Sequence, residues 1–255
     1  MIGLTAWSWP RRREASRPAF TLIELLVVII VVSILLAIAL PALGRARTSA
    51  RVGGGTQVVR QLVGSLGLYA GDHRGEFPFF GTPGDPYAPV MLHGKEIRWG
   101  YFRTHRWFWA SVVYPEYIDA TRDVLEGLDR AESLASQGFP SEIVASRFQM
   151  SSTAFADPRF WRDDPEGNWM RTSYFRAMRH ADVVHPASKG ILGADLGGPG
   201  GLQPLGPEHP IGLADGSART VTSSYLDSKP AVSRPFGALP FAIEATPDGL
   251  AGRDF

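Results

Sequence analysis

Residues 20–43 read FTLIELLVVIIVVSILLAIALPAL, and this stretch decides the architecture of the chain. Between Leu25 and Leu40 the only polar side chain is that of Ser33. At a rise of about 1.5 Å per residue, a helix from Phe20 to Leu40 would be roughly 30 Å long, which matches the hydrocarbon core of a bilayer. A helix that is apolar on every side is better solvated by lipid than by water, so we expect a single transmembrane helix here.

Two other interpretations of this segment are a cleaved secretory signal and a twin-arginine export signal. The apolar region of a secretory signal usually spans only about 7 to 15 residues, and the run here is longer. It is also longer and more hydrophobic than the apolar region of a twin-arginine signal. Both flanks of the run are basic, so charge alone does not decide the orientation. The basic residues are Arg11, Arg12, Arg13 and Arg17 before it, and Arg45, Arg47, Arg51 and Arg60 after it.

Glu24 interrupts the apolar run at its fifth position. A carboxylate in lipid costs at least a few kcal/mol, so an ionisable residue in a membrane segment is a functional hypothesis by default. One interpretation is that Glu24 lies near the interface, where it snorkels or is protonated. The other is that it has a charged partner, because a cut just before Phe20 would create an α-amino group four residues away. That amine could pair with Glu24 of an adjacent subunit.

The local sequence Pro18-Ala19-Phe20-Thr21-Leu22-Ile23-Glu24 resembles the processing motif of type IV prepilins and type II secretion pseudopilins. The resemblance implies that prepilin peptidase cuts between Ala19 and Phe20 and then methylates the amine of Phe20. It also implies that Glu24 registers each subunit in a helical filament through a neighbour's N-terminus. Pro41 falls where these proteins often carry a proline that kinks the helix. The family usually has Gly before the cut, where this chain has Ala19.

The helix is expected to continue beyond Pro41 with one apolar stripe. Gly53, Gly54 and Gly55 interrupt this pattern at a cost of up to about 1 kcal/mol each relative to Ala, so a locally loosened or broken helix is expected there. The helix should end near residues 69–71, before a turn at residues 72–78. The stripe consists of Val52, Val59, Leu62, Val63 and Leu66.

Residues 45–78 are also similar to a planctomycete-type subgroup of pilin-like proteins. Those proteins commonly show an Arg-Gln-Leu helix, a Tyr-Ala-x-Asp turn and a Phe-Pro pair, and they tend to end in a strand with an Ala-Asp-Gly turn preceded by a His. Residues 211–221 fit that hairpin, with His209 before it. Asp215-Gly216 between alternating apolar residues is a good hairpin signal in its own right.

The family resemblance implies an α+β fold, in which a long N-terminal helix packs on an antiparallel β-sheet head with extensive loops. Five segments are expected along the chain. They are a leader peptide at 1–19, a transmembrane and assembly helix at 20–43, an amphipathic continuation at 44–71, a globular pilin-like head at 72–227 and a C-terminal tail at 228–255. That tail contains four prolines and is expected either to be partly disordered or to wrap the head.

The composition excludes several classes of protein. With 26 Lys and Arg against 25 Asp and Glu, the formal net charge is +1, so a strongly basic nucleic-acid binder is not expected. The chain has no Cys, which excludes disulfides, zinc knuckles, iron–sulfur ligation and a thiol nucleophile. The sequence has no H-E-x-x-H, G-x-S-x-G, P-loop or G-x-G-x-x-G motif, and no catalytic residue is expected.

Two features of the head suggest a ligand. An acidic turn could hold Ca²⁺, because that ion takes six to eight oxygen ligands in flexible geometry, but acidic turns are usually only solvated. Eight aromatic side chains between Trp99 and Tyr117 are interleaved with arginines, a mixture used by hydrophobic cores, subunit contacts, sugar platforms and single-strand nucleic-acid binders. Nucleic-acid binding is not expected, because the chain lacks a strong net basic charge. Core packing and subunit contact are the favoured interpretation. The candidate calcium ligands are Asp163, Asp164, Glu166 and Asn168.

The leading hypothesis is a structural, non-enzymatic subunit of a type IV pilus-like or type II secretion pseudopilus filament. Its expected partners are prepilin peptidase, other pilin or pseudopilin subunits, an inner-membrane assembly platform and the lipid bilayer. It would cross the inner membrane once, with its N-terminus cytoplasmic and its head periplasmic. The alternative is a membrane-anchored periplasmic carbohydrate-binding module or enzyme that uses the aromatic cluster and the acidic turn.

Overall fold

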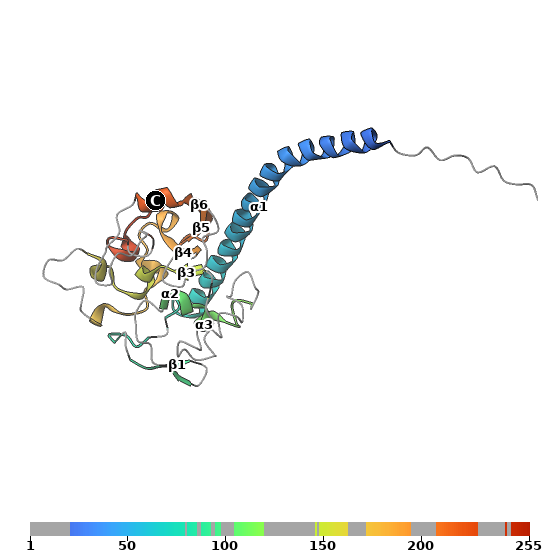
Figure 1. Ribbon diagram of the computed structural model, residues 1–255. Coiled ribbons are helices and arrows are strands. Elements are labelled where there is room, and N and C mark those ends of the chain that lie inside the picture. Colours follow the sequence, from blue (N-terminus) through green and yellow to red (C-terminus); the bar gives the residue numbers. More distant parts are fainter. Residues whose placement is uncertain are drawn as a thin grey trace, which may run out of the picture. The chain divides into compact units, whose positions relative to one another are not determined.

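The computed structural model describes residues 21–79, 81–85, 88–92, 95–97, 105–119, 146, 148–162, 172–194, 208–228, 243 and 246–255. The chain divides into two compact units, Met1–Ala46 and Arg47–Phe255. Helix α1 (Leu22–Asp72) begins in the first unit and ends in the second, which also contains the sheet of the head (Figure 1).

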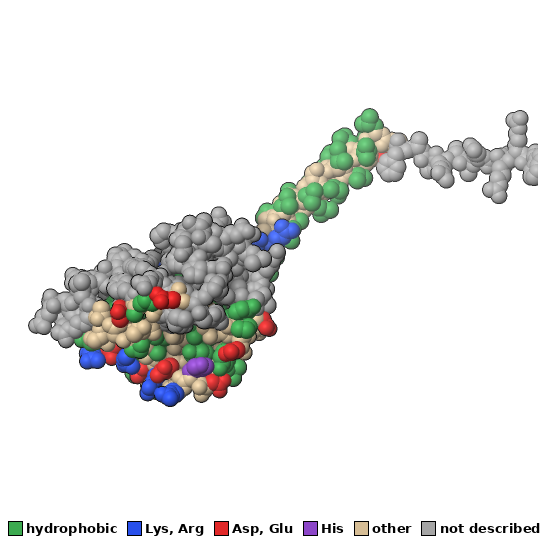
Figure 2. Space-filling model, turned by 90° about the horizontal axis from the view of Figure 1, so that it is seen from below, with side chains coloured by type: hydrophobic (Ala, Val, Ile, Leu, Met, Phe, Trp, Pro, Cys, Tyr) green, Lys and Arg blue, Asp and Glu red, His purple; other side chains and the backbone are tan. Residues whose placement is uncertain are grey.

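The first part of α1 has no buried side chain. Every residue from Thr21 to Arg51 is exposed, including the large aliphatic ones. Figure 2 shows hydrophobic side chains over the visible face of this segment. Among the described residues, α1 is the one helix long and apolar enough to cross a membrane by length and composition. The expected apolar segment is therefore present as a helix.

The second part of α1 packs on the head through one face. Its buried positions recur at spacings of three, four and seven residues, so they form a stripe along the helix. The polar and glycine positions between them are mostly exposed. The five residues expected to form this stripe are all buried, and two more join them. The buried residues of α1 are Val52, Val59, Leu62, Val63, Leu66, Tyr69 and Ala70.

The break expected at Gly53–Gly55 is wrong, because α1 continues through these three residues without interruption. Val52 and Val59 are buried on either side of the glycines, so packing against the head holds the helix across them. The hydroxyl of Thr56 also donates a hydrogen bond to the Val52 carbonyl at 2.9 Å. Tertiary contacts override the low helix propensity of glycine here.

Helix α1 ends in a left-handed turn. Arg74 and Gly75 both have positive φ angles, of 57° and 80°. The Gly75 amide donates a hydrogen bond to the Ala70 carbonyl at 2.7 Å, as in a Schellman motif. Glycine adopts this backbone conformation without steric cost, so the sequence Arg74-Gly75 stops the helix where the chain turns into the head.

The head contains a four-stranded antiparallel sheet in the order β3-β4-β5-β6. Its strands are β3 (Phe148–Met150), β4 (Gly190–Ala194), β5 (Glu208–Leu213) and β6 (Ala218–Thr222). Strands β5 and β6 form the expected hairpin, with Gly216 at a φ angle of 87° in its turn. The expected α+β, pilin-like fold of one long helix and an antiparallel sheet is confirmed.

The sheet is covered on both faces. On one face Gly212 of β5 lies against α1, where a Cβ atom would be only 2.3 Å from Val63 Cγ2 and 2.8 Å from Val59 Cγ1. Ile211 and Leu213, its neighbours in β5, belong to a separate cluster on the other face. Helix α1 therefore packs on one face of the sheet, and a second hydrophobic cluster packs on the other face. The second cluster consists of Ile211, Leu213, Val221, Leu226 and Ile243.

Short elements complete the described part of the head. Trp109, between α2 and α3, is fully buried, and its indole N–H donates to the Phe148 carbonyl at 2.8 Å. This bond ties the segment after α2 to strand β3. The short elements are β1 (Val90–Leu92), β2 (Lys95–Ile97), α2 (His105–Phe108), α3 (Ala110–Val113), η2 (Ser152–Phe155), η3 (Pro158–Trp161), η5 (Thr172–Tyr174), η6 (His180–Asp182), η7 (Pro186–Ser188), α5 (Ser223–Asp227) and η9 (Gly249–Ala251).

Candidate processing and assembly site

Glu24 and Thr21 cap the N-terminus of α1 through reciprocal hydrogen bonds. One carboxylate oxygen, Oε2, accepts hydrogen bonds from the Thr21 amide at 2.8 Å and from its hydroxyl at 2.7 Å. In return, the Glu24 amide donates to Thr21 Oγ1 at 3.3 Å. This is a capping box, in which two amides without an intrahelical partner are satisfied by side chains. The acidic group also lies in the first turn, where the helix dipole favours negative charge.

The capping box uses only one of the two carboxylate oxygens of Glu24. No described residue donates a hydrogen bond to the other oxygen, Oε1. The side chain is exposed, so Oε1 can accept a hydrogen bond or pair with a cation from outside the chain. Thr21 thus holds the carboxylate in place while leaving it able to bind a donor.

The side chain of Ser33, farther along the helix, is hydrogen-bonded within the helix itself. The hydroxyl of Ser33 donates to the Ile29 carbonyl at 2.6 Å, so the one polar side chain in the apolar run needs no external partner. Pro41 lies inside α1, where its ring removes one main-chain hydrogen bond. The kink expected at Pro41 stays a prediction.

The comparison with protein families concerns this same segment. Residues 16–40 match the family model described as the prokaryotic N-terminal methylation motif. The chain carries a prepilin-type methylation motif. The expected resemblance to type IV pilin-like proteins and pseudopilins is thereby confirmed for a segment that includes Thr21, Glu24 and most of the apolar run. The motif implies processing by prepilin peptidase and assembly with other pilin subunits, and the apolar helix fits the membrane anchor of a pilin-like protein.

The head has no such counterpart in the comparisons. No curated protein and no solved structure matches the chain. The similarity of residues 45–78 and 209–221 to the planctomycete-type subgroup therefore stays a prediction.

Several predicted site residues lie outside the described residues. Ala19 and Phe20, on either side of the expected cut, are among them, as is the acidic turn. Within the part of the chain that the structure describes, no group of three or more His, Asp or Glu side chains could hold a metal ion. The calcium site predicted at Asp163, Asp164, Glu166 and Asn168 stays a prediction.

The aromatic segment contributes to the core where the structure describes it. Phe108 and Trp109 are buried, while Tyr114 and Tyr117 pack against the core from its margin. The hydroxyl of Tyr117 donates to Asp72 Oδ2 at 3.0 Å, which ties this segment to the end of α1. Trp99, Tyr101 and Phe102 lie outside the described residues. The described aromatics support the core interpretation.

His209 lies near the start of strand β5, and Asp215 lies in the turn after the end of that strand. His209 Nε2 is hydrogen-bonded to the hydroxyl of Ser223 at 2.8 Å. The carboxylate of Asp215 accepts from the amide and the hydroxyl of Ser217, at 2.9 and 2.6 Å, within the hairpin turn. The structure does not bring the two side chains together, so each has a local structural role.

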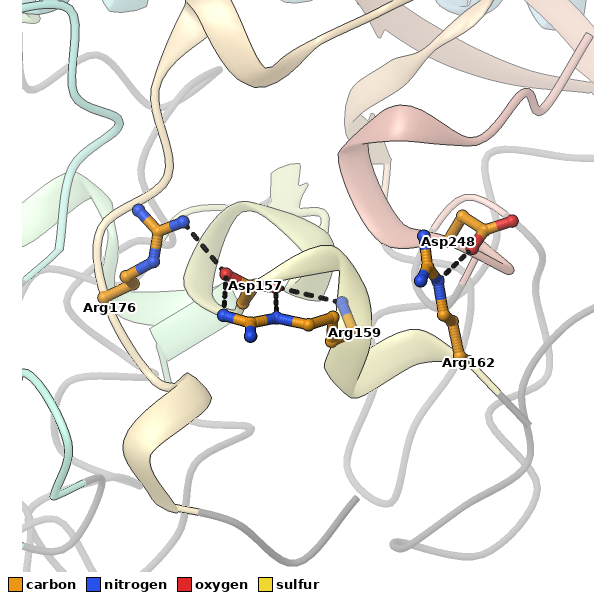
Figure 3. A network of polar contacts seen from close by, with 5 residues as sticks. All are labelled: Asp157, Arg159, Arg162, Arg176 and Asp248. Atoms are coloured by element: carbon orange, nitrogen blue, oxygen red, sulfur yellow. Dashed lines mark hydrogen bonds and ion pairs between the residues drawn. The ribbon is translucent and has the colours of Figure 1, made fainter. Parts of the chain in front are cut away.

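A network of exposed arginines surrounds Asp157 on the head (Figure 3). Arg159 Nε lies 2.9 Å and Arg176 Nη2 lies 3.1 Å from the Asp157 carboxylate, and Arg162 pairs separately with Asp248 at 2.8 Å. The hydrogen bond from Arg159 is the main cause that holds the pKa of Asp157 well below its ordinary value. Arg159 pairs with the N-cap residue of its own helix η3, whereas the pairs made by Arg176 and Arg162 join η3 to segments farther along the chain.

The capping role of Thr21 was not among the expectations drawn from the sequence. Its signal was present, since Thr-x-x-Glu before an apolar run is the sequence signature of a capping box. Thr21 and Glu24 stand in that spacing, with Leu22 and Ile23 between them.

Proposed function

We propose that this chain is a structural subunit of a type IV pilus-like or type II secretion pseudopilus filament. The observation that carries the proposal is the exposed apolar part of α1, which starts at a capped carboxylate and lies in the matched motif. Exposed apolar helices are stabilised by burial in lipid before assembly and in a helix bundle afterwards. The precursor crosses the inner membrane once, with the head periplasmic.

Processing prepares the site for assembly. Prepilin peptidase cuts between Ala19 and Phe20, and the new amine of Phe20 is methylated. The amine of one subunit then pairs with the Glu24 carboxylate of its neighbour, for which Oε1 is available in the capping box. Apolar burial drives the bundle, and the ion pair specifies its alignment, because pairing two charges in an apolar environment contributes little net stability.

The first experiment is the intact mass of the protein extracted from membranes. Loss of residues 1–19 together with the gain of one methyl group supports the proposal. A full-length, uncleaved chain contradicts it. The alternative of a membrane-anchored binding module or enzyme predicts that the leader is retained.

A second experiment addresses Glu24 directly. Glu24→Val should leave membrane insertion intact and should prevent incorporation into filaments with wild-type partners, measured by immunoblotting of the sheared filament fraction. Ser33→Ala is the matched control, because it also removes a polar group from the segment, but one that bonds only to its own helix. If Glu24→Val enters filaments as Ser33→Ala does, Glu24 has no registering role.

A further inference from the structure

Lys189, Thr246 and Asp254 form a polar cluster in the interior of the head. The side chains of Lys189 and Asp254 are completely buried, and Lys189 Nζ lies 3.1 Å from Asp254 Oδ2. Lys189 Nζ also donates to the hydroxyl of Thr246, which in turn donates to Asp254 Oδ1. The Gly190 amide completes the cluster by donating to Asp254 Oδ2 at 2.9 Å. Both carboxylate oxygens are therefore satisfied.

The cluster joins two segments that are far apart in the sequence. Lys189 immediately precedes strand β4, whereas Thr246 and Asp254 belong to the C-terminal strap, residues 246–255. Main-chain bonds reinforce the connection, because the amides of Asp254 and Phe255 both donate to the Ser188 carbonyl, at 2.9 and 3.3 Å. The start of β4 is thus the point at which the strap is fixed to the sheet.

Other contacts of the strap are apolar or exposed. Leu250 is fully buried in the main core, and Gly249 lies so close to Trp161 that a Cβ atom would be 2.4 Å from its ring. At the surface, the ring of Phe255 stacks on Tyr225 with 5.6 Å between centroids, and the Arg219 guanidinium lies 4.6 Å from its centre. Contacts of this kind are favourable but only weakly directional.

Unlike apolar contacts, a buried ion pair forms only when its two charged groups are in one relative position, so it restricts where the strap can dock. Replacing such a pair by apolar residues is often neutral for stability, whereas removing one partner is strongly destabilising because it leaves a buried charge unpaired. The chain has no Cys, so no disulfide can fix the strap. We propose that the Lys189–Thr246–Asp254 cluster is a register lock that selects a single docked position of the C-terminal strap.

The lock has a consequence at the surface of the head. The register of the strap determines where Phe255 meets Tyr225 and where Asp248 meets Arg162 (Figure 3). A strap that shifted by one residue would present a different set of side chains on this face. This inference is independent of the filament proposal, because it concerns contacts within the head.

Hydrogen–deuterium exchange of the full-length chain in detergent tests the lock. The peptides to compare cover residues 186–194 and 246–255, with residues 208–222 of the β5–β6 hairpin as the internal reference. Asp254→Asn and Lys189→Met should each accelerate exchange in the first two peptides by about tenfold or more relative to the hairpin. Unchanged exchange in both variants would overturn the proposal.

The double variant Lys189→Met/Asp254→Leu distinguishes an effect on the register of the strap from an effect on the stability of the head. It remains informative even if the single variants fold poorly. Its melting temperature should recover toward that of the wild type, because no buried charge is left unpaired. Exchange in residues 186–194 and 246–255 should nevertheless stay faster than in the wild type. If the double variant protects both peptides as the wild type does, apolar packing alone sets the register and the proposal is wrong.

Asp248→Asn is the matched control on the same strap. It breaks an ion pair whose partners are exposed, with side-chain exposures of 61% for Arg162 and 53% for Asp248. Asp248 has a φ angle of 61°, a conformation that Asn also tolerates. Exchange in the strap should match the wild type, since exposed pairs contribute little. If this control loosens the strap as much as Asp254→Asn, the effect is not specific to the buried cluster and the lock is refuted.

Discussion

The two parts of helix α1 are built from similar apolar residues but lie in different environments. From Thr21 to Arg51 every side chain is exposed, whereas from Val52 to Ala70 one face is buried in the head. Within the first part, the run from Leu25 to Leu43 is apolar on all sides except at Ser33, whereas the second part alternates apolar with polar or glycine positions. Periodicity, and not hydrophobicity alone, therefore separates a segment suited to lipid from one suited to a protein core.

The same substitution in the two parts should have very different effects. Leu66→Ala, at a fully buried position, should lower the free energy of unfolding of the head by about 2–5 kcal/mol. Leu36→Ala, at a position that is 52% exposed, should change it by less than about 0.5 kcal/mol. Chemical unfolding in detergent, followed by fluorescence of the buried Trp109 and Trp161, measures both. Equal losses would show that the first part of α1 also stabilises the head.

The close approach of α1 to β5 offers a second test of the packed part. Gly212→Ala should lower the free energy of unfolding by about 1–3 kcal/mol, because its Cβ would overlap Val63 and Val59. Gly64→Ala is the control, since a Cβ there meets no atom within 4 Å. The same unfolding measurement applies. A neutral Gly212→Ala variant would mean that α1 can move away from the sheet at no cost.

Acid should destabilise the packed head through His105. Burial lowers the pKa of His105 from its ordinary 6.5 to about 3, and the side chain is only 1% exposed. Between these two values the unfolded chain binds a proton that the folded head does not. Stability should therefore fall as the pH falls through this range, by up to about 1.4 kcal/mol per pH unit.

His105→Gln should flatten this pH dependence. The wild type is the reference for this comparison. Denaturant midpoints between pH 4 and pH 7 give the slope for each variant. A wild-type slope that persists in His105→Gln would assign the acid sensitivity to other groups.

The smallest effect is expected at the glycines near the start of the packed part of α1. Gly54→Ala should raise the thermal stability of the helix by about 0.5–1 kcal/mol, because Ala has the higher helix propensity and its Cβ would meet no atom within 4 Å. Gly75→Ala should lower the thermal stability, because Gly75 has a φ angle of 80°, which alanine adopts only with strain. Thermal melts followed by circular dichroism compare them. A destabilising Gly54→Ala would show that this position needs glycine for a contact.

The sequence was most informative where one periodic signal dominated. The buried stripe from Val52 to Leu66 follows from spacing alone, and the β5–β6 hairpin follows from Asp215-Gly216 between alternating apolar residues. The prepilin-type motif was equally readable, because its residues are contiguous in the sequence. Local patterns of this kind need no knowledge of tertiary contacts.

Features that depend on distant residues could not be predicted in this way. Propensity favoured a break at Gly53–Gly55, but packing of Val52 and Val59 against the head holds the helix together. The pairing of Lys189 with Asp254 joins positions separated by more than sixty residues. A lysine and an aspartate in loop-like sequence give no signal of burial, because charged residues are usually exposed.

The hydrogen bond from Ser33 to the Ile29 carbonyl has a mechanical consequence. Because this hydroxyl donates within its own helix, the described helix between Leu25 and Leu40 offers a neighbour no free side-chain hydrogen-bond donor. A displacement along the helix axis then exchanges one apolar contact for another at nearly constant free energy. Such a segment can slide past lipid or a second helix until its polar end, at Thr21 and Glu24, meets a partner and stops it.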